Sequence, residues 1–226
     1  GINAEYGEIN MTNQDVMFKV LVVGNAGVGK TCILKRLIYK SFSEAYKSTI
    51  GVDFGFYKAQ IDENTSARMM LYDIAGQERY NVLMRSYYKD AYCAFVVGDL
   101  TSATLRDDLR SWKSSIDSKV TFPNTQETIP VYMLCNKCDL PNEYQDSDLE
   151  KMSQELGFQK WFKTSALTGN NLEEATIDLA KLVIKYIQEK GVNKKNDDDN
   201  IINLVEDEPQ NDKTGNKKPQ KKDGCC

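Results

Sequence analysis

The segment Gly24-Asn25-Ala26-Gly27-Val28-Gly29-Lys30-Thr31 sets the architecture expected of this chain. It has the form G-x-x-x-x-G-K-[ST], follows an apolar run at residues 18–23 and precedes a helical pattern at residues 33–38. Such glycines let successive backbone N–H groups turn toward phosphate oxygens, and the next helix adds the positive end of its dipole. By average residue usage, a chain of this length carries the pattern by accident about once in a hundred cases. The octet therefore predicts nucleotide binding.

Two side chains of the octet carry chemistry of their own. Lys30 is expected to place its charge between the β- and γ-phosphates, and the Thr31 hydroxyl is expected to ligate Mg²⁺. The octet does not identify the base, because adenylate kinases and ATPases share it. A nucleotide kinase therefore stays open at this point.

A second motif selects guanine. Asn136-Lys137-Cys138-Asp139 has the form N-K-x-D and follows a buried-type strand at residues 131–135. In open α/β sheets ligands bind at the carboxyl ends of strands, so this loop should lie beside the octet. Asp139 can accept both N1–H and the 2-amino group of guanine, whereas adenine would leave it unpaired. We expect Asn136 to hold the loop and contact the base edge, and the Lys137 stem to cover a ring face.

Composition limits the class of protein. The chain has 226 residues, is 41% hydrophobic, carries a formal net charge of -4 and has no histidine. The negative charge argues against a nucleic-acid binder, and the missing histidine excludes Ser-His-Asp triads and His-ligated zinc. No apolar window is long enough to span a membrane, and we expect no secretory signal. Of the six cysteines, Cys135 and Cys138 formally make a C-x-x-C pair, so a redox dithiol is a weaker alternative.

Alternating strand and helix patterns predict an α/β domain with a mainly parallel sheet of six strands, one of them antiparallel, and helices on both faces. The turn-rich residues 62–66 favour antiparallel pairing of their flanking strands. Expected strands are 18–23, 52–61, 67–72, 94–97, 130–135 and 160–163. Helical apolar spacing occurs at residues 105–116 and 172–186, where the apolar stripes, Trp112 included, are interpreted as core without chemistry.

Three segments are expected along the chain. Residues 1–15 are predicted to be a flexible N-terminus, residues 16–190 the nucleotide-binding domain, and residues 191–226 a disordered tail. The tail has no aromatic residue and contains runs of like charge, so it is not expected to bury enough apolar surface to fold.

Taken together, these motifs resemble those of the small GTPases of the Ras superfamily, over residues 17–190. The octet, Thr49, residues 73–77, the N-K-x-D loop and residues 164–166 occur in that family's order and spacing. Residues 50–54, 77–80 and 84–89 resemble the Rab branch. Ile74 and residues 112–120 are similar to the Rab subgroup linked with lysosome-related organelles. The implied fold is the P-loop GTPase fold.

The resemblance implies roles for single residues, each of which has an ordinary structural explanation when it is taken alone. Gln77 is expected to orient the attacking water, and Gly76 to bring its N–H to the γ-phosphate. Magnesium ligands are expected to be Thr31, Thr49 and, through water, Asp73. The nucleotide-contacting residues are expected to be Asn25, Ala26, Gly27, Val28, Gly29, Lys30, Thr31, Cys32, Phe42, Thr49, Gly76, Asn136, Lys137, Asp139, Ser165, Ala166 and Leu167.

Two positions depart from relatives. Ala26 stands where Ras proteins have glycine, and its methyl group is expected to crowd the attacking water. Leu167 stands where many relatives have lysine. With leucine at this position, stacking on the base is expected to be weaker. Hydrolysis is therefore expected to be slow alone and accelerated by an activating protein that supplies an Arg and often a Gln. A constitutively GTP-bound scaffold with negligible turnover is the alternative that Ala26 leaves open and Gln77 opposes.

The chain ends in Cys225-Cys226, which resembles the doubly geranylgeranylated end of Rab proteins. Two lipids provide stable anchoring where one is marginal, and the nearby lysines add attraction to an anionic leaflet. The resemblance implies an exchange factor, an activating protein, effectors that bind the switch loops, a GDP-dissociation inhibitor and a prenylation escort. The expected location is the cytoplasmic face of an endosomal, lysosome-related or other organelle, with a cytosolic pool.

Overall fold

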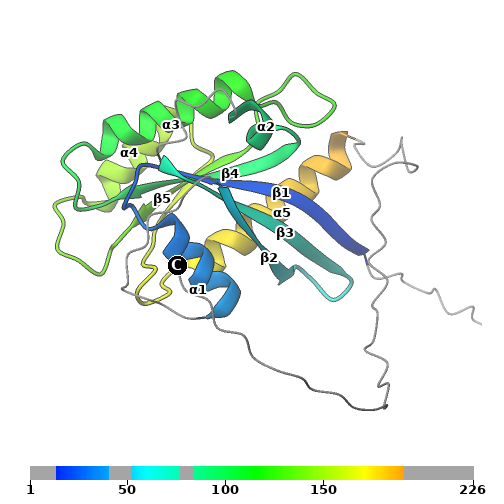
Figure 1. Cartoon of the computed structure of the whole chain (residues 1–226), viewed down its shortest axis with the longest axis horizontal. Coiled ribbons are helices and arrows are strands. Elements are labelled where there is room, and N and C mark those ends of the chain that lie inside the picture. The colour runs from blue at the N-terminus through cyan, green and yellow to red at the C-terminus, as the bar shows by residue number, and fades with distance from the viewer. Residues whose placement is uncertain (1–13, 41–51, 77–83, 191–226) are drawn as a thin grey trace, which may run out of the picture. The chain divides into compact units, whose positions relative to one another are not determined.

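The computed structural model describes residues 14–40, 52–76 and 84–190. These residues form a six-stranded sheet with helices on both faces, as the sequence predicts (Figure 1). In chain order the elements are β1 (Gln14–Val23), α1 (Lys30–Tyr39), β2 (Val52–Gln60), β3 (Thr65–Ile74), α2 (Met84–Tyr88), β4 (Ala91–Asp99), α3 (Leu105–Lys119), β5 (Val131–Asn136), α4 (Asp146–Leu156), β6 (Lys160–Lys163) and α5 (Leu172–Lys190).

The strands are arranged in the order β2-β3-β1-β4-β5-β6. All neighbouring pairs are parallel except β2 and β3, whose antiparallel pairing confirms the expectation from the short turn at residues 62–66. β1 lies between β3 and β4. After β1 the chain first forms β2 and β3 on one side of it and then β4, β5 and β6 on the other. This is the position at which open α/β sheets bind ligands, beyond the carboxyl ends of the strands.

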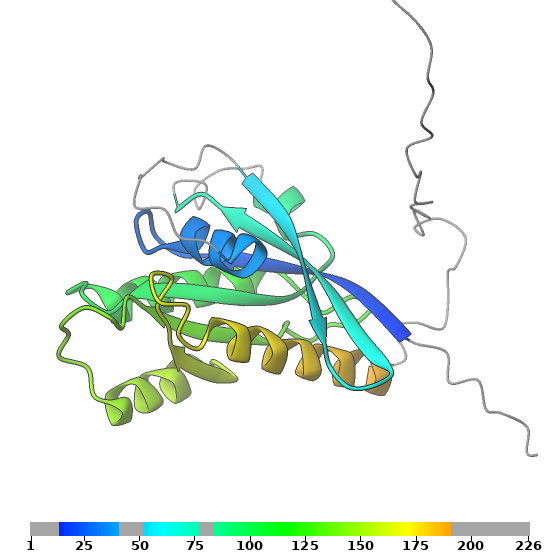
Figure 2. The ribbon, with the colours of Figure 1, turned by 90° about the horizontal axis from the view of Figure 1, so that it is seen from below.

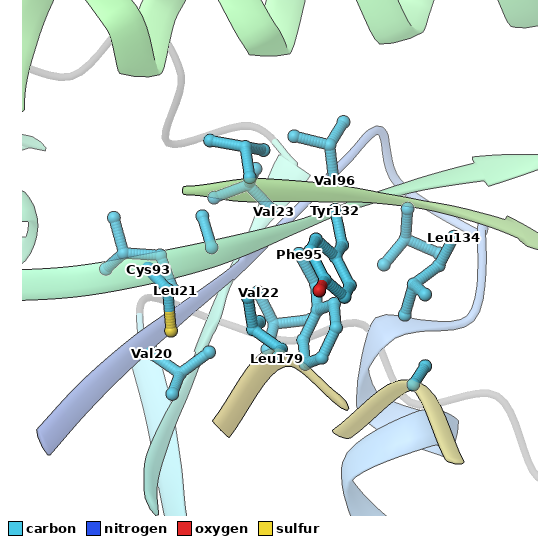
Figure 3. Packing of buried hydrophobic residues seen from close by; sticks show 14 of the residues in the cluster. Val20, Leu21, Val22, Val23, Cys93, Phe95, Val96, Tyr132, Leu134 and Leu179 are labelled. Carbon is cyan, nitrogen blue, oxygen red and sulfur yellow. The ribbon is translucent and has the colours of Figure 1, made fainter. Parts of the chain in front are cut away.

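Helices cover the sheet in two layers. α3 lies on one face with α2 and α4 beside it, and α1 and α5 lie on the other (Figures 1 and 2). Neighbouring residues of a strand point to opposite faces, so both layers receive apolar side chains from β1 and β4. Figure 3 shows Val22, Phe95 and Leu179 gathered on the face that α5 covers, while Val23 and Val96 point away from it. The apolar stripe of α3 is fully buried, which confirms the core assignment of Leu105, Leu109, Trp112 and Ile116.

Several boundaries differ from the expected ones. β1 begins at Gln14 rather than at residue 18, because the amphipathic start of the strand pairs with β3: the Ser66 hydroxyl donates to Asp15 at 2.9 Å, and Arg68 donates to the same carboxylate at 2.8 Å. β4 extends three residues before and two residues after the expected range 94–97. α4 is a helix that the apolar spacing did not reveal. Within the described residues, no helix combines the length and the apolar character needed to cross a bilayer.

Candidate guanine-nucleotide site

The phosphate loop connects the end of β1 to the start of α1. Gly29 precedes the helix with φ of 104°, a left-handed conformation that favours glycine. A Cβ there would also lie 2.4 Å from Asn136 Nδ2, so the second motif packs directly on the loop. The first turn of α1 contains no acidic residue that would repel an anion from the positive end of the helix dipole.

Lys30 lies inside the loop rather than in solvent, with only 6% of the residue exposed. Its Nζ donates to the carbonyl oxygens of Gly24 at 2.8 Å and Asn25 at 2.9 Å. Burial lowers the pKa of Lys30 to about 8, although the negative charge of Asp73 opposes this shift. A phosphate group beside Nζ would favour the charged form and restore a higher pKa.

Thr31 and Asp73 come together from α1 and the end of β3. The Thr31 hydroxyl donates to a carboxylate oxygen of Asp73, and Asp73 is fully buried. A hydroxyl and a carboxylate are the oxygen donors that Mg²⁺ takes from proteins when substrate phosphates and waters complete its shell, so the pair fits that ion. Across the described residues, no group of three His, Cys, Asp or Glu side chains is placed to hold a metal.

Gly76 lies against the phosphate loop. A Cβ at this position would be 2.4 Å from the Ala26 nitrogen and 2.7 Å from the Asn25 carbonyl carbon. Only a residue without a side chain permits this approach. The segment that follows β3 therefore begins in contact with the loop expected to bind the γ-phosphate.

Asn136 joins three parts of the site. Its Nδ2 donates to the Val28 carbonyl at 2.9 Å, and its Oδ1 accepts from the Ala166 N–H and the Thr164 hydroxyl, each at 3.2 Å. The residue is 1% exposed, so these bonds form away from water and hold the loops firmly. Asn136, expected from the sequence to hold one loop, is bonded both to the phosphate loop and to the loop after β6.

The carboxylate of Asp139 is oriented by the loop after β6. Ser165 donates its hydroxyl to Asp139 at 2.5 Å and accepts the Thr168 N–H at 3.1 Å. The same loop is fastened to α1, because Arg36 donates to the Ala166 carbonyl at 2.9 Å and also to the Leu167 carbonyl. Leu167 itself is 44% exposed. These bonds preorganise an acceptor of the kind that guanine requires.

Lys137 is held by Asp99 at the end of β4. Its Nζ donates to Asp99 at 2.5 Å, and the other oxygen of Asp99 accepts from both the N–H and the hydroxyl of Thr101. Burial alone would raise the pKa of Asp99, but these hydrogen bonds outweigh it and lower the pKa. Because Asp99 keeps its charge, it fixes the direction of the Lys137 side chain.

The structure thus gathers most of the predicted residues at the carboxyl ends of β1, β3, β5 and β6. Cys32, in the first turn of α1, is partly buried, and Ala26 is exposed on the loop. Five residues of the predicted set lie outside the described residues: Phe42, Thr49, Gln77, Cys225 and Cys226.

The alternative role of Cys135 and Cys138 as a redox dithiol loses its chemical basis. Cys135 is buried in β5, and burial raises the pKa of its thiol to about 12, although Lys163 partly opposes the shift. The thiolate that dithiol exchange needs is therefore scarce near neutral pH. Both sulfurs are free thiols, and Cys138 Sγ accepts a hydrogen bond from Asn170 at 3.6 Å.

Sequence reasoning missed three residues that shape the site: Asp99, Arg36 and Trp112. Asp99 could have been found, because it ends a buried strand beside Asn136 in the sheet register. Arg36 binds carbonyls 130 and 131 residues away, and Trp112 bonds with Asn25 across 87 residues. Hydrogen bonds between residues so far apart in the sequence cannot be predicted from a local pattern.

Comparison with known proteins gives one consistent result. The sequence profile of the Ras family matches residues 19–185. The chain is 43% identical over 187 residues to Ras-related protein Rab-32 of Homo sapiens, covering 82% of each chain. It is 42% identical over 174 residues to Ras-related protein Rab-32A of Dictyostelium discoideum, covering 76% of this chain and 80% of the relative. It is also 43% identical over 166 residues to Ras-related protein Rab-7L1 of Homo sapiens, covering 73% and 81%.

Proposed function

Because the chain belongs to the Ras family and is a Rab-like small GTPase, we propose that residues 16–190 act as a Mg²⁺-dependent GTP/GDP switch that recruits effectors to a membrane. The family assignment accounts for GTP hydrolysis and guanine-nucleotide binding. The proposal adds the metal ion, the residues in their roles, and the partners.

The observation that carries the site assignment is the bonding of Asn136. One buried amide connects the carbonyl of Val28 in the phosphate loop with the Ala166 N–H in the loop that orients Asp139. This bonding supports the assignment of the two loops to a single site, one half for phosphate and the other for the base. A pocket of this kind fits one guanine nucleotide with its phosphates over α1.

The residues of the pocket divide the work. Lys30 Nζ exchanges its bonds to the Gly24 and Asn25 carbonyls for bonds to phosphate oxygens. The N–H groups after Gly24 donate to phosphate oxygens as well. Asp139 accepts two donors of guanine, and the stem of Lys137 covers the ring. Thr31 and Asp73 would hold Mg²⁺, which neutralises charge on the β- and γ-phosphates when it is bound.

Hydrolysis is proposed to depend on Gln77, which orients the attacking water, and on Thr49, which completes the metal shell. Phe42 is proposed to pack against guanine. The methyl group of Ala26 slows the intrinsic rate, and an activating protein raises it. A Gln77→Leu variant should therefore lose single-turnover hydrolysis while it keeps GTP binding; an unchanged rate would remove the role of Gln77.

Effectors are proposed to bind the aromatic side chains of β2 and β3. Phe54 and Phe56 are 57% and 49% exposed, their rings pack edge to face with centroids 6.0 Å apart, and Phe54 stacks on Tyr72 at 5.6 Å. Exposed aromatic clusters of this kind mark interaction sites. Since β2 and β3 adjoin the nucleotide-dependent segments, a partner that binds there can sense the nucleotide.

Membrane attachment is proposed to come from two prenyl groups on Cys225 and Cys226, with a prenylation escort and a GDP-dissociation inhibitor carrying the lipidated chain. The proposed location is an endosomal or lysosome-related membrane, with a cytosolic pool. Replacing both cysteines by serine should move the protein from the membrane pellet to the supernatant of fractionated cells. Unchanged partition would contradict the lipidation.

The nucleotide itself tests the core of the proposal. The purified chain is denatured and the released nucleotide is separated by chromatography, and we expect GDP or GTP. Nucleotide dissociation should become faster when EDTA removes magnesium. Asp139→Ala should lose guanine selectivity, whereas Glu174→Ala, which changes an exposed acid in the first turn of α5, should keep it. Recovery of an adenosine nucleotide would overturn the proposal.

A further inference from the structure

Trp112 is buried in α3 but reaches the phosphate loop with its polar atom. Its indole Nε1–H donates to Asn25 Oδ1 at 2.8 Å, while the side chain is buried in the hydrophobic core. A buried indole needs an acceptor, and here the acceptor is the second residue of the octet. The interpretation of this side chain as core alone, made from helical spacing, is therefore incomplete.

Asn25 occupies a central place in the loop. Its backbone carbonyl accepts from Lys30 Nζ at 2.9 Å, and its carbonyl carbon lies where Gly76 makes its close approach. Trp112 thus holds the side chain of Asn25. The backbone of Asn25 in turn contacts Lys30 and lies against Gly76, where the segment after β3 begins. Any shift of Asn25 changes both contacts.

We propose that Trp112 is a positioning residue for GTP hydrolysis, acting through Asn25 to fix the loop backbone against Gly76. The inference rests on the proposed function of the site. The side of the loop formed by Asn25 and Ala26 faces Gly76, which is assigned to the γ-phosphate, so loss of the bond affects the triphosphate state. Neither substitution removes Lys30, the loop N–H groups or Asp139, so the affinity for GDP should fall less than the rate of hydrolysis.

The test compares three single variants. Trp112→Phe keeps an aromatic ring in the core and removes the donor, and Asn25→Ala removes the acceptor while it keeps the backbone. Each should slow single-turnover GTP hydrolysis about tenfold and raise the dissociation constant for GDP by a smaller factor, about threefold or less. Trp161→Phe is the matched control, because Trp161 donates to Glu150 at 2.6 Å, away from the loop, and its hydrolysis rate should be unchanged.

The double variant separates positioning from simple destabilisation. If the two residues act through their bond, Trp112→Phe combined with Asn25→Ala should be no slower than either alone. In the wild-type protein, the indole ¹H–¹⁵N signal of Trp112 should move when a non-hydrolysable GTP analogue replaces GDP, and it should not move in Asn25→Ala.

Two results would overturn the inference. One is a hydrolysis rate in Trp112→Phe or Asn25→Ala within twofold of wild type, and the other is full multiplication of the two single effects in the double variant. Failure of the proposed function is distinguishable, because the wild-type chain would then not bind GTP at all.

Discussion

At the scale of single residues, Lys30 is placed to exchange hydrogen bonds to backbone carbonyl oxygens for hydrogen bonds to phosphate oxygens. Its ammonium group donates to two backbone carbonyls and is desolvated by burial. This arrangement keeps the group in position at the cost of a lowered pKa. Phosphate oxygens would add negative charge to that which Asp73 already supplies.

The first prediction follows from the pKa of Lys30, which is about 8 in the folded protein and 10.5 for an ordinary, solvent-exposed lysine such as that of the unfolded chain. Between these values the unfolded chain binds more protons, so the stability of the nucleotide-free protein should rise with pH from about 8 to 10.5. Nucleotide affinity should fall over the same range, because the charged lysine becomes rarer. Calorimetric titration with GDP at pH 8.5, in two buffers of different ionisation enthalpy, should show proton uptake.

Lys30→Met supplies the control for this titration. The variant should bind GDP at least about a hundredfold more weakly, because the charge-assisted bonds to phosphate are lost. Its proton uptake should vanish, and its nucleotide-free form should be no less stable than wild type. Proton uptake that persists in Lys30→Met would assign the titration to another group.

A second residue-scale prediction concerns Ser165, which orients the base-selecting carboxylate. Ser165→Ala removes a 2.5 Å hydrogen bond to Asp139, and bonds to charged groups contribute about 1.5–3 kcal/mol. Guanine-nucleotide affinity should fall about tenfold or more, measured by competition with a fluorescent GDP. Ser118→Ala, in which an exposed hydroxyl on α3 is removed, should bind normally. Equal affinities of the two variants would show that Asp139 needs no support.

At the scale of elements, the site depends on loops that different strands bring to one edge of the sheet. The motifs of these loops are visible in the sequence, because Gly29, Lys30 and Asp139 are defined by local spacing. The helix α4 was missed because it carries a narrow apolar stripe, with Leu149 and Met152 as its buried apolar residues. Its ends do carry signals: Asp148 accepts the Gln145 N–H at 2.9 Å, and Gly157 ends the helix with φ of 75°.

The connections between elements could not be predicted in the same way. Arg36 fastens α1 to the loop after β6, and Trp112 fastens α3 to the loop after β1. In both cases the helical spacing correctly gave the packing of the helix. The hydrogen-bond partners of the two polar groups could not be predicted, because they lie far away in the sequence and are close only in the folded chain.

Asn136 gives the prediction that belongs to this scale. Asn136→Ala leaves the Val28 carbonyl and the Ala166 N–H without these partners in a buried region, which should destabilise the nucleotide-free protein by about 3 kcal/mol. For a domain of this size the melting temperature should drop by about 6–12 °C. Asn170→Ala, which removes an amide that donates to Cys138 Sγ at 3.6 Å, should change it little. A similar drop in both variants would contradict the bridging role.

At the scale of the whole molecule, the described residues form one α/β domain whose core comes from both faces of the sheet (Figure 3). Ligand binding at one edge of the sheet should therefore stabilise the domain as a unit. At a GDP concentration about a thousand times the dissociation constant, stabilisation should be about 4 kcal/mol, or roughly 8–16 °C in melting temperature. Thermal scans should show this shift with GDP or GTP and none with ADP or ATP. An equal shift with ADP would contradict guanine selectivity.

The antiparallel pairing of β2 with β3 also determines how the nucleotide state can be communicated. Val52 opposes Ile74, so the segment before β2 and the segment after β3 depart from directly paired positions. Paired Cα atoms in such a ladder are about 4.5–5.5 Å apart. We therefore expect a partner protein that binds this hairpin to contact the starting points of both segments at once, and to respond only when both have the arrangement of the same nucleotide state.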